Sequence, residues 1–295
     1  MNYILSTIPR MMIGVIHNPN SGKRNHGEKM KHFLSLLTEE GIEYEYRETK
    51  GQGDAYRMAA EMADRCDVIV VASGDGTIFE AINGTWDRDV AYVVLPYGTG
   101  NDLYQGVYGK GFSEEMLVRA IKHGNSKMID CARINDKYTL TLIGSFGLPA
   151  DMVIKHKETG CSYGRTIPGI LAHVRRYNYT LKINGRELEY ETEFIGAFGA
   201  GFAGGGMRVT NLSSMTDGMM EMVVIKKSSV IRRLLNLLAI IRGRLDDQPN
   251  VDTFQFTECV LIPEKTMPCN LDGEVIDLYD LNIKVYKQKL KFLVE

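Results

Sequence analysis

Three apolar runs rich in β-branched residues lie within the first hundred residues, and each is followed by a polar loop that contains glycine. The runs are Met12 to His17, Val68 to Val71 and Val90 to Leu95. Short, continuous apolar runs are typical of strands buried on both faces of a parallel sheet. The loops are Asn18-Pro19-Asn20-Ser21-Gly22, Ser73-Gly74-Asp75-Gly76-Thr77 and Pro96-Tyr97-Gly98-Thr99-Gly100-Asn101-Asp102. Because ligands bind beyond the carboxyl ends of the strands in such sheets, the three loops are candidates for one site.

Helical patterns separate these runs. Met30, Phe33, Leu34 and Leu37 follow an i, i+3, i+4, i+7 spacing that predicts an amphipathic helix. A second helix is predicted to start at Asp54. Strands that alternate with helices through short crossovers form a parallel sheet covered on both sides. Residues 1–127 are therefore predicted to fold as a three-layer α/β domain.

The pattern changes near Met128. Beyond it, short strand patterns follow one another, linked by turns such as Asn184-Gly185. Residues 128–295 are predicted to be mostly β, an antiparallel sandwich, with the option that the last strand packs back on the first domain. The predicted strands are Tyr138 to Ile143, Thr180 to Ile183, Glu193 to Phe198, Met220 to Ile225, Thr253 to Ile262 and Asn282 to Val294, and the predicted helices are Ile167 to Tyr177 and Val230 to Leu245.

Composition excludes several classes of protein. Lys plus Arg number 35 and Asp plus Glu 37, a formal net charge of −2, so no global positive field attracts nucleic acid. The five cysteines are scattered without a CxxC spacing, as expected of free thiols in a reducing compartment. No signal peptide is recognisable at the start, and arginines interrupt the longest apolar stretch. A cytoplasmic protein is predicted.

The three glycine loops are suited to phosphate. Glycine lets backbone N–H groups approach a phosphate closely, and the N-terminus of a following helix adds partial positive charge. Any one loop could be no more than a tight turn, whereas three at one sheet edge favour a nucleotide site. No GxxxxGK[ST] loop is present. A GxGxxG pattern at Gly199-Ala200-Gly201-Phe202-Ala203-Gly204 lacks a following helix pattern, which argues against a dinucleotide site there.

A series of short motifs carries a family resemblance. They are Asn18 to Gly22, Gly74-Asp75-Gly76-Thr77, Gly98 to Asp102, Gly204 to Met207, Asp217-Gly218 and Leu271-Asp272-Gly273-Glu274. In order and spacing the series resembles the diacylglycerol kinase catalytic-domain family, which includes soluble bacterial lipid kinases and sphingosine kinases. The resemblance implies a nucleotide-binding α/β domain followed by a β-sandwich lipid-substrate domain, with ATP in the cleft between them. It further implies Mg²⁺-dependent transfer of the γ-phosphoryl group to a diacylglycerol-like lipid hydroxyl.

The resemblance also implies roles for individual residues. Asp272 is the implied general base, with Glu274 and Asp75 in supporting catalytic roles. Asp75, Asp102 and Glu274 are the implied magnesium ligands, and Asp217 is implied to hold a structural metal. Ser73 stands where the family usually has glycine. The implied nucleotide-binding residues are Asn18, Ser21, Gly22, Ser73, Gly74, Gly76, Thr77, Gly98, Thr99, Gly100 and Asn101.

Several alternatives stay open. An NAD kinase-like enzyme with a soluble substrate, or a nucleotide sensor without turnover, would also use glycine loops. Asp272 before Gly273 could be a simple turn residue. The basic helix pattern from Val230 to Leu245 favours a helix packed on the sandwich with its arginines in water, over one lying on anionic lipid. Peripheral contact with a lipid substrate at the membrane surface and a homodimer are expected from the resemblance.

Overall fold

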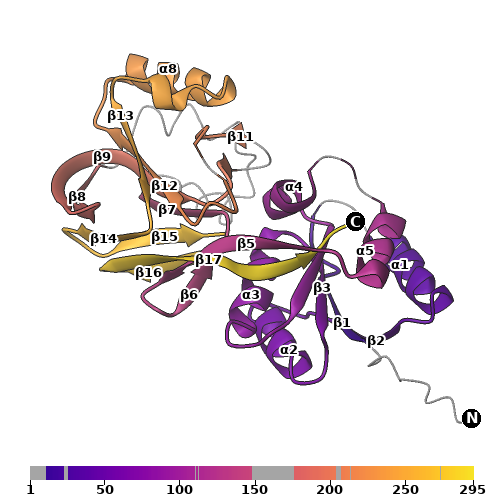
Figure 1. Ribbon diagram of the computed structural model, residues 1–295. Helices are drawn as coiled ribbons and strands as arrows, with labels where there is room; N and C mark the ends of the chain where they lie inside the picture. Colours follow the sequence, from indigo (N-terminus) through magenta and orange to yellow (C-terminus); the bar gives the residue numbers. More distant parts are fainter. Residues whose placement is uncertain are drawn as a thin grey trace, which may run out of the picture. The chain divides into compact units, whose positions relative to one another are not determined.

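The computed structural model describes residues 11–22, 26–109, 111, 113–147, 176–203, 207–212, 214–272 and 274–295 (Figure 1). The chain forms two compact units. Unit 1 contains residues up to Thr99, the segment Tyr108–Lys127 and the last residues Lys291–Glu295. Unit 2 contains Gly100–Val107 and Met128–Leu290. Each unit therefore draws on segments that are far apart in the sequence.

Unit 1 is built on a parallel sheet. Its strands are β1 (Met12–His17), β2 (Glu43–Glu48), β3 (Val68–Ser73) and β4 (Ala91–Pro96). They run side by side in the order β4-β3-β1-β2, all parallel. The end of β17 (Leu281–Leu293) adds a further parallel pairing to β4, through Lys291 and Phe292.

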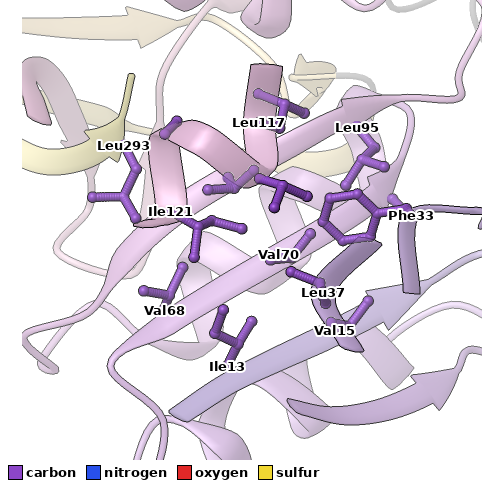
Figure 2. Close-up of a cluster of buried hydrophobic side chains, with 14 of the residues drawn as sticks. Ile13, Val15, Phe33, Leu37, Val68, Val70, Leu95, Leu117, Ile121 and Leu293 are labelled. Carbon is purple, nitrogen blue, oxygen red and sulfur yellow. The ribbon is translucent and has the colours of Figure 1, made fainter. Parts of the chain in front are cut away.

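Helices cover both faces of this sheet. They are α1 (Gly27–Glu39), α2 (Asp54–Met62), α3 (Asp75–Gly84) and α5 (Glu114–His123). Figure 2 shows Phe33 and Leu37 of α1, with Leu117 of α5, packed in one buried cluster with Val15 and other strand residues. α2 and α3 pack on each other and contact β1 and β3 respectively. The predicted three-layer α/β fold is confirmed, although the sequence analysis missed α5.

Alternation along the strands explains the two faces. Val15 lies in the cluster under α1 and α5, whereas its neighbour Gly14 faces α2. A Cβ at Gly14 would come within 2.7 Å of the Met62 sulfur, so glycine lets α2 approach β1 closely. The small size of Gly14 thus allows the short separation between β1 and α2.

Unit 2 is an antiparallel β domain, as predicted. A ladder runs in the order β16-β15-β7-β9-β8-β14-β17, and β12 pairs with β9 and β13. The Asn184-Gly185 turn joins β8 to β9 with φ of 52° and 72°, the left-handed pair that the predicted hairpin requires. The elements are β5 (Ser126–Ile134), β6 (Tyr138–Leu140), β7 (Ile143–Gly147), β8 (Tyr177–Ile183), β9 (Arg186–Phe198), β10 (Phe202–Ala203), β11 (Met207–Arg208), β12 (Met220–Lys226), β13 (Val251–Phe256), β14 (Glu258–Pro263), β15 (Met267–Leu271) and β16 (Glu274–Leu278), with helices α4 (Asp102–Tyr108), α8 (Val230–Ile241) and the 3-10 turn η1 (Leu245–Asp247).

Two predicted strands are each divided in the structure. The run Thr253 to Ile262 forms β13 and β14, which have different partners, β12 and β8. The break falls at Thr257, whose carbonyl accepts a hydrogen bond from the Val285 N–H at 2.7 Å. The run Tyr138 to Ile143 divides into β6 and β7 because the intervening N–H groups donate to a side chain instead of a strand.

Two predicted helices also need correction. The pattern Val230 to Leu245 ends its helix earlier, at Ile241, and Gly243 then takes a left-handed φ of 63°. The predicted helix Ile167 to Tyr177 lies almost wholly outside the described residues, and Tyr177 itself begins β8. The rejected GxGxxG pattern leads into the short strand β10, so a dinucleotide helix does not follow it. None of the helices in the described residues is long and apolar enough to cross a bilayer.

Candidate active site

The three glycine loops meet at the carboxyl edge of the sheet in unit 1. Because β1, β3 and β4 are neighbouring parallel strands, their following loops lie next to one another. The Asn18 N–H donates to the Ala72 carbonyl at 3.1 Å, and the Tyr97 N–H donates to the Ser73 carbonyl at 3.2 Å. The loops are thus fixed to each other's strands, and the predicted grouping is present in the fold.

A small network centres on the Thr77 hydroxyl. Its oxygen accepts a hydrogen bond from Asn18 Nδ2 at 3.1 Å and one from Ser73 Oγ at 2.7 Å. A threonine hydroxyl has two acceptor positions and one proton to donate. With both acceptor positions used, the hydroxyl proton of Thr77 is left to donate to a ligand. Ser73, which replaces the usual family glycine, therefore orients a donor in the first turn of α3.

The N-terminus of α3 adds electrostatic attraction for an anion. Gly74 caps this helix in an extended conformation, and Asp75 and Gly76 are its first two residues. Unpaired N–H groups at a helix start carry partial positive charge and bind phosphate well. The partly exposed Thr77 hydroxyl lies in the same turn. This arrangement can bind a phosphate group through both backbone and side-chain donors.

Glycine is needed here for close approach between the loops. Gly22 has a φ of 70°, and a Cβ on it would come within 2.5 Å of the Tyr97 carbonyl oxygen. A Cβ on Gly74 would lie 3.1 Å from the Gly98 Cα. The Ser21 hydroxyl donates to the same Tyr97 carbonyl at 2.8 Å. Packing between the loops thus explains these two glycines.

The third loop is divided between the two units. Gly98 and Thr99 belong to unit 1, whereas Gly100, Asn101 and Asp102 belong to unit 2. Asn101 takes a left-handed φ of 55°, and the following Asp102 is buried at the start of α4. The structure therefore brings together the predicted nucleotide residues of the first two loops, with Gly98 from the third. Gly100, Asn101 and Asp102 belong to unit 2.

An aromatic contact supports this edge of unit 1 and was missed by sequence reasoning. The His26 ring stacks on the Tyr97 ring with centroids 4.5 Å apart and planes inclined by 7°. Tyr97 is almost fully buried, and this burial raises the pKa of its phenol. The ring contact joins the start of α1 to the third loop. Two aromatic residues so far apart in the sequence gave no signal of it.

Asp272 is the most unusual carboxylate of unit 2. It lies in the turn that joins β15 to β16, with a φ of 46°, yet its side chain is only 3% exposed. Its Oδ2 accepts from the N–H and the hydroxyl of Thr141 at 2.7 and 2.8 Å. Its Oδ1 accepts from the N–H groups of Leu142 and Ile143 at 3.0 and 2.8 Å. A simple surface turn would leave this side chain in water.

Two opposing effects act on the ionisation of Asp272. Burial raises the pKa of its carboxyl group and outweighs the hydrogen bonds from Thr141, Leu142 and Ile143, which lower it. The four donors occupy the four lone-pair directions of the two oxygens. For this carboxylate to accept another proton, one donor must turn away, and the Thr141 hydroxyl is the one that can rotate.

Neighbouring acidic residues have distinct surroundings. Glu274 pairs with Leu271 across the same hairpin and is partly exposed. Asp217 accepts a hydrogen bond from the Met219 N–H at 2.9 Å, within its own loop. Asp130 fixes that loop, because its carboxylate accepts from the N–H groups of Gly218 and Gln288 at 2.6 and 2.7 Å. Sequence reasoning missed Asp130, which is buried in the middle of β5 (Ser126–Ile134).

Metal ligation was predicted for Asp75, Asp102, Glu274 and Asp217. Within the described residues, no group of three or more His, Cys, Asp or Glu side chains is placed to hold a metal ion. Mg²⁺ commonly binds through one or two carboxylates and several waters, so it does not need such a group. The partly exposed Asp75 residue, in the first turn of α3, fits that donor set. The structural metal at Asp217 stays a prediction.

Comparison with known families identifies both parts of the chain. Residues 12–134 match the diacylglycerol kinase catalytic domain, and residues 153–294 match the YegS C-terminal NAD kinase beta sandwich-like domain. The chain belongs to the diacylglycerol kinase catalytic-domain family. The two matches together span unit 1 and most of unit 2, in the order that the sequence predicted. This family membership makes the chain a kinase and therefore a phosphotransferase.

Individual relatives agree with this placement. The diacylglycerol kinase of Bacillus subtilis (strain 168) is 28% identical over 272 residues, covering 88% of each chain. The probable lipid kinase YegS of Salmonella gallinarum is 28% identical over 287 residues, covering 92% of this chain and 93% of that protein. A solved structure named as a "putative diacylglycerol kinase" from Bacillus anthracis str. Sterne has a TM-score of 0.80 at 19% identity, covering 97% and 98% of the two chains, and supports the fold.

Proposed function

We propose that this chain transfers the γ-phosphoryl group of ATP to the hydroxyl of a diacylglycerol-like lipid. The observation that carries the proposal is the Thr77 network, in which Asn18 and Ser73 leave one hydroxyl proton to donate beside the start of α3. Family membership supports the choice of a lipid acceptor. The proposal assigns ATP to unit 1 and the acceptor hydroxyl to Asp272 of unit 2, both serving one reaction at the cytoplasmic face of a membrane.

Phosphoryl transfer needs positioning and charge neutralisation more than a strong nucleophile. The backbone N–H groups at the start of α3 and the Thr77 hydroxyl bind the phosphates of the nucleotide in this proposal. Asn18, Ser21 and the glycines of the loops set the distances between these donors. Because the loops are fixed to one another before nucleotide binds, little reorganisation is needed at the moment of transfer.

Magnesium fits the Asp75 carboxylate at the start of α3. Asp75 and Asp102 would hold the ion together with water, and Glu274 would support that water network. Bound Mg²⁺ neutralises negative charge on the phosphate oxygens. The Asp75 carboxylate sits one residue after the helix cap, so it is next to the N–H groups that bind phosphate. The Asp75 carboxylate can therefore bind the metal ion while the backbone N–H groups stay available to the phosphate.

Asp272 is the proposed general base. A base must come within hydrogen-bond reach of the hydroxyl whose proton it accepts. Rotation of the Thr141 hydroxyl frees a lone pair on Oδ2 for that proton, while the three backbone N–H groups keep the carboxylate in place. Burial, which raises the pKa of Asp272, makes the carboxylate a better proton acceptor. The remaining backbone donors act in the opposite direction and favour the ionised form.

The test is ADP release from ATP and Mg²⁺ with a panel of acceptors. The panel contains diacylglycerol, phosphatidylglycerol, a sphingoid base, NAD and no acceptor, for the native protein and Thr77→Val. Turnover with a lipid, weakened in the variant, supports the proposal and identifies the lipid class. Turnover with NAD alone replaces it by an NAD kinase activity. Nucleotide binding without turnover on any acceptor replaces it by a nucleotide sensor.

A further inference from the structure

Helix α8 is attached to unit 2 through a side that carries two buried polar residues. Arg233, Asn236 and Ala239 are its buried residues. The Arg233 guanidinium donates to Glu193 Oε1 through Nε at 3.0 Å and through Nη2 at 2.7 Å. Glu193 also accepts from the N–H and hydroxyl of Ser228, at 2.9 Å each, just before the helix starts. A buried ion pair on β9 therefore fixes which side of α8 faces unit 2.

The opposite side of α8 is apolar and exposed. Ile231 is 73% exposed and Ile241 67% exposed, with three leucines between them that are each more than two-fifths exposed. Their spacing of i, i+3, i+4, i+7 and i+10 places all five on one side of the helix. These residues are called the α8 apolar face: Ile231, Leu234, Leu235, Leu238 and Ile241.

This orientation reverses the one expected from sequence, in which the apolar side packs inward. Figure 1 shows α8 beside β13 and β11 of unit 2. The buried residues of α8 are Arg233, Asn236 and Ala239, and Ile240 packs partly buried against the core of unit 2. Soluble proteins rarely expose a contiguous apolar patch of this kind without a binding role. Within the described residues, the packing of unit 2 leaves these five side chains exposed, which favours a partner that covers them.

The charges next to the face indicate what that partner is. Arg232 lies in the first turn of α8, Arg242 and Arg244 follow its end, and α8 contains no acidic residue. None of the three arginines has an ion pair within the described part of the chain. The next carboxylate along the chain, Asp246, already accepts from the Asn211 N–H and the Thr253 hydroxyl. The α8 apolar face is thus bordered by cations that remain available to an anionic surface.

A second copy of the chain fits this pattern poorly. A twofold contact places the same patch against itself. Pairing α8 with α8 would bring the three arginines of each copy near those of the other, with no carboxylate on the helix to offset them. An anionic bilayer offers acyl chains for the leucines and isoleucines and phosphates for the arginines. Amphipathic helices at membrane surfaces combine these two contacts.

We propose that α8 lies flat on an anionic bilayer, with the α8 apolar face among the acyl chains and Arg232, Arg242 and Arg244 at the headgroup phosphates. That the chain meets a membrane at all rests on the proposed function. The exposed apolar surface follows from the fold of unit 2 alone. The ion pair of Arg233 with Glu193 keeps the apolar face outward, so the docking surface is formed before any lipid is met.

Vesicle co-sedimentation of the full chain tests the proposal. Vesicles of phosphatidylcholine mixed with phosphatidylglycerol are compared with vesicles of phosphatidylcholine alone. Binding to the mixed vesicles is expected to fall about tenfold or more in the triple variant Ile231→Gln, Leu235→Gln and Leu238→Gln. The triple variant Arg232→Gln, Arg242→Gln and Arg244→Gln is expected to lose the preference for the mixed vesicles. All six positions are at least partly exposed, which protects the fold.

A matched control removes exposed aromatic surface elsewhere. Tyr56→Gln with Tyr279→Gln changes two side chains that are 52% and 53% exposed and is expected to bind vesicles as the native chain does. Equal losses in the control and the α8 variants would overturn the proposal. So would unchanged vesicle binding by the glutamine triple variant, including the case in which light scattering shows that this variant converts a native dimer to a monomer.

A second assay separates this proposal from the kinase proposal. Kinase activity is measured with a short-chain, monomeric diacylglycerol and with long-chain diacylglycerol in vesicles. The α8 variants are expected to keep the first activity and to lose about tenfold of the second. Vesicle binding that depends on α8, in a chain without kinase activity, supports the docking surface and overturns only the proposed function. Equal activity of native and variant chains on vesicles that both bind equally overturns the docking surface.

Discussion

Thr141 donates two hydrogen bonds to Oδ2 of Asp272, one from its N–H at 2.7 Å and one from its hydroxyl at 2.8 Å. The same carboxylate accepts two more N–H groups on its other oxygen. These bonds join the turn between β15 and β16 to the corner between β6 and β7. One side chain thus has a structural role and a proposed catalytic role, and substitution affects both.

Asp272→Asn is expected to abolish turnover and to lower the free energy of unfolding by about 2–4 kcal/mol. The asparagine NH2 group would face N–H or O–H donors of residues 141–143. It cannot accept their hydrogen bonds as the carboxylate oxygen does. Turnover and urea unfolding of the same preparation measure both effects. A folded variant that retained native turnover would contradict the assignment of Asp272 as the base.

Thr141→Val is the companion variant. It removes one hydroxyl donor but keeps the shape of the side chain and all three backbone donors, so a stability loss of about 1 kcal/mol is expected. Because the lone pair on Oδ2 is then open, turnover is expected to stay within a few-fold of native. Loss of turnover comparable to that of Asp272→Asn would show that the hydroxyl itself is needed for catalysis.

Thr77→Val is expected to weaken binding of ATP about tenfold, because it removes one donor to a charged phosphate, worth about 1.5–3 kcal/mol. It also leaves Asn18 and Ser73 without their acceptor. Titration calorimetry with ATP measures the change. Thr38→Val, on the exposed side of α1, is the matched control and is expected to bind ATP normally. Native affinity in the Thr77 variant would remove Thr77 from the nucleotide site.

Gly22→Ala and Gly41→Ala form a matched pair. Their φ values are 70° and 68°, so both variants pay the same left-handed penalty of about 1–2 kcal/mol. Only at Gly22 would the new Cβ meet an atom, the Tyr97 carbonyl oxygen at 2.5 Å, whereas nothing lies within 4 Å at Gly41. Gly22→Ala is therefore expected to cost more stability and to weaken ATP binding. Identical unfolding midpoints and ATP affinities for the pair would refute this role of the close loop contact.

Glu193→Gln is expected to lower the stability of the chain by about 3–5 kcal/mol at neutral pH, because it leaves the buried Arg233 without its partner. Burial raises the pKa of Glu193, but hydrogen bonds from Arg233 and Ser228 outweigh this, and the pKa lies below its usual value of 4.5. The ionised side chain therefore stabilises the fold above pH 4.5, and this contribution is lost as the pH falls from there through the lower folded-state value.

Unfolding by urea between neutral and acid pH checks this dependence. The native chain is expected to lose stability on the acid side, and the Glu193→Gln variant to show a flatter curve there. Glu191→Gln provides the control on the same strand, since Glu191 pairs with Lys227 at the surface and should contribute at most about 1 kcal/mol. Parallel curves for native and Glu193→Gln proteins would show that this ion pair does not set the acid limit.

The sequence predicted the elements whose partners are local or follow a strict period. The runs that became β1 and β3, the helix from Met30 to Leu37 and the Asn184-Gly185 hairpin belong to this group. Their identity depends on periodicity and turn chemistry, which a few adjacent residues supply. The glycine loops were grouped correctly because parallel neighbours place their carboxyl ends together.

Features that depend on distant partners could not be predicted. The sequence pattern of α8 indicated which side is apolar but not whether that side faces unit 2 or solvent. The orientation depends on the ion pair of Arg233 with Glu193, which lies forty positions earlier in the sequence. The burial of Asp272 depends on N–H groups that the sequence pattern had placed within a strand. Gly199 belongs to an apparent nucleotide motif, yet its lack of a side chain is explained by the Thr141 carbonyl, which a Cβ would approach to 2.3 Å.

The last strand gives the chain an order of assembly during synthesis. Leu293 lies in the buried cluster of unit 1 with Val68 and Ile121, and Lys291 and Phe292 extend that unit's sheet. Every residue of unit 2 leaves the ribosome before these residues do. The hydrophobic interior of unit 1 therefore stays incomplete on the nascent chain until unit 2 has been translated.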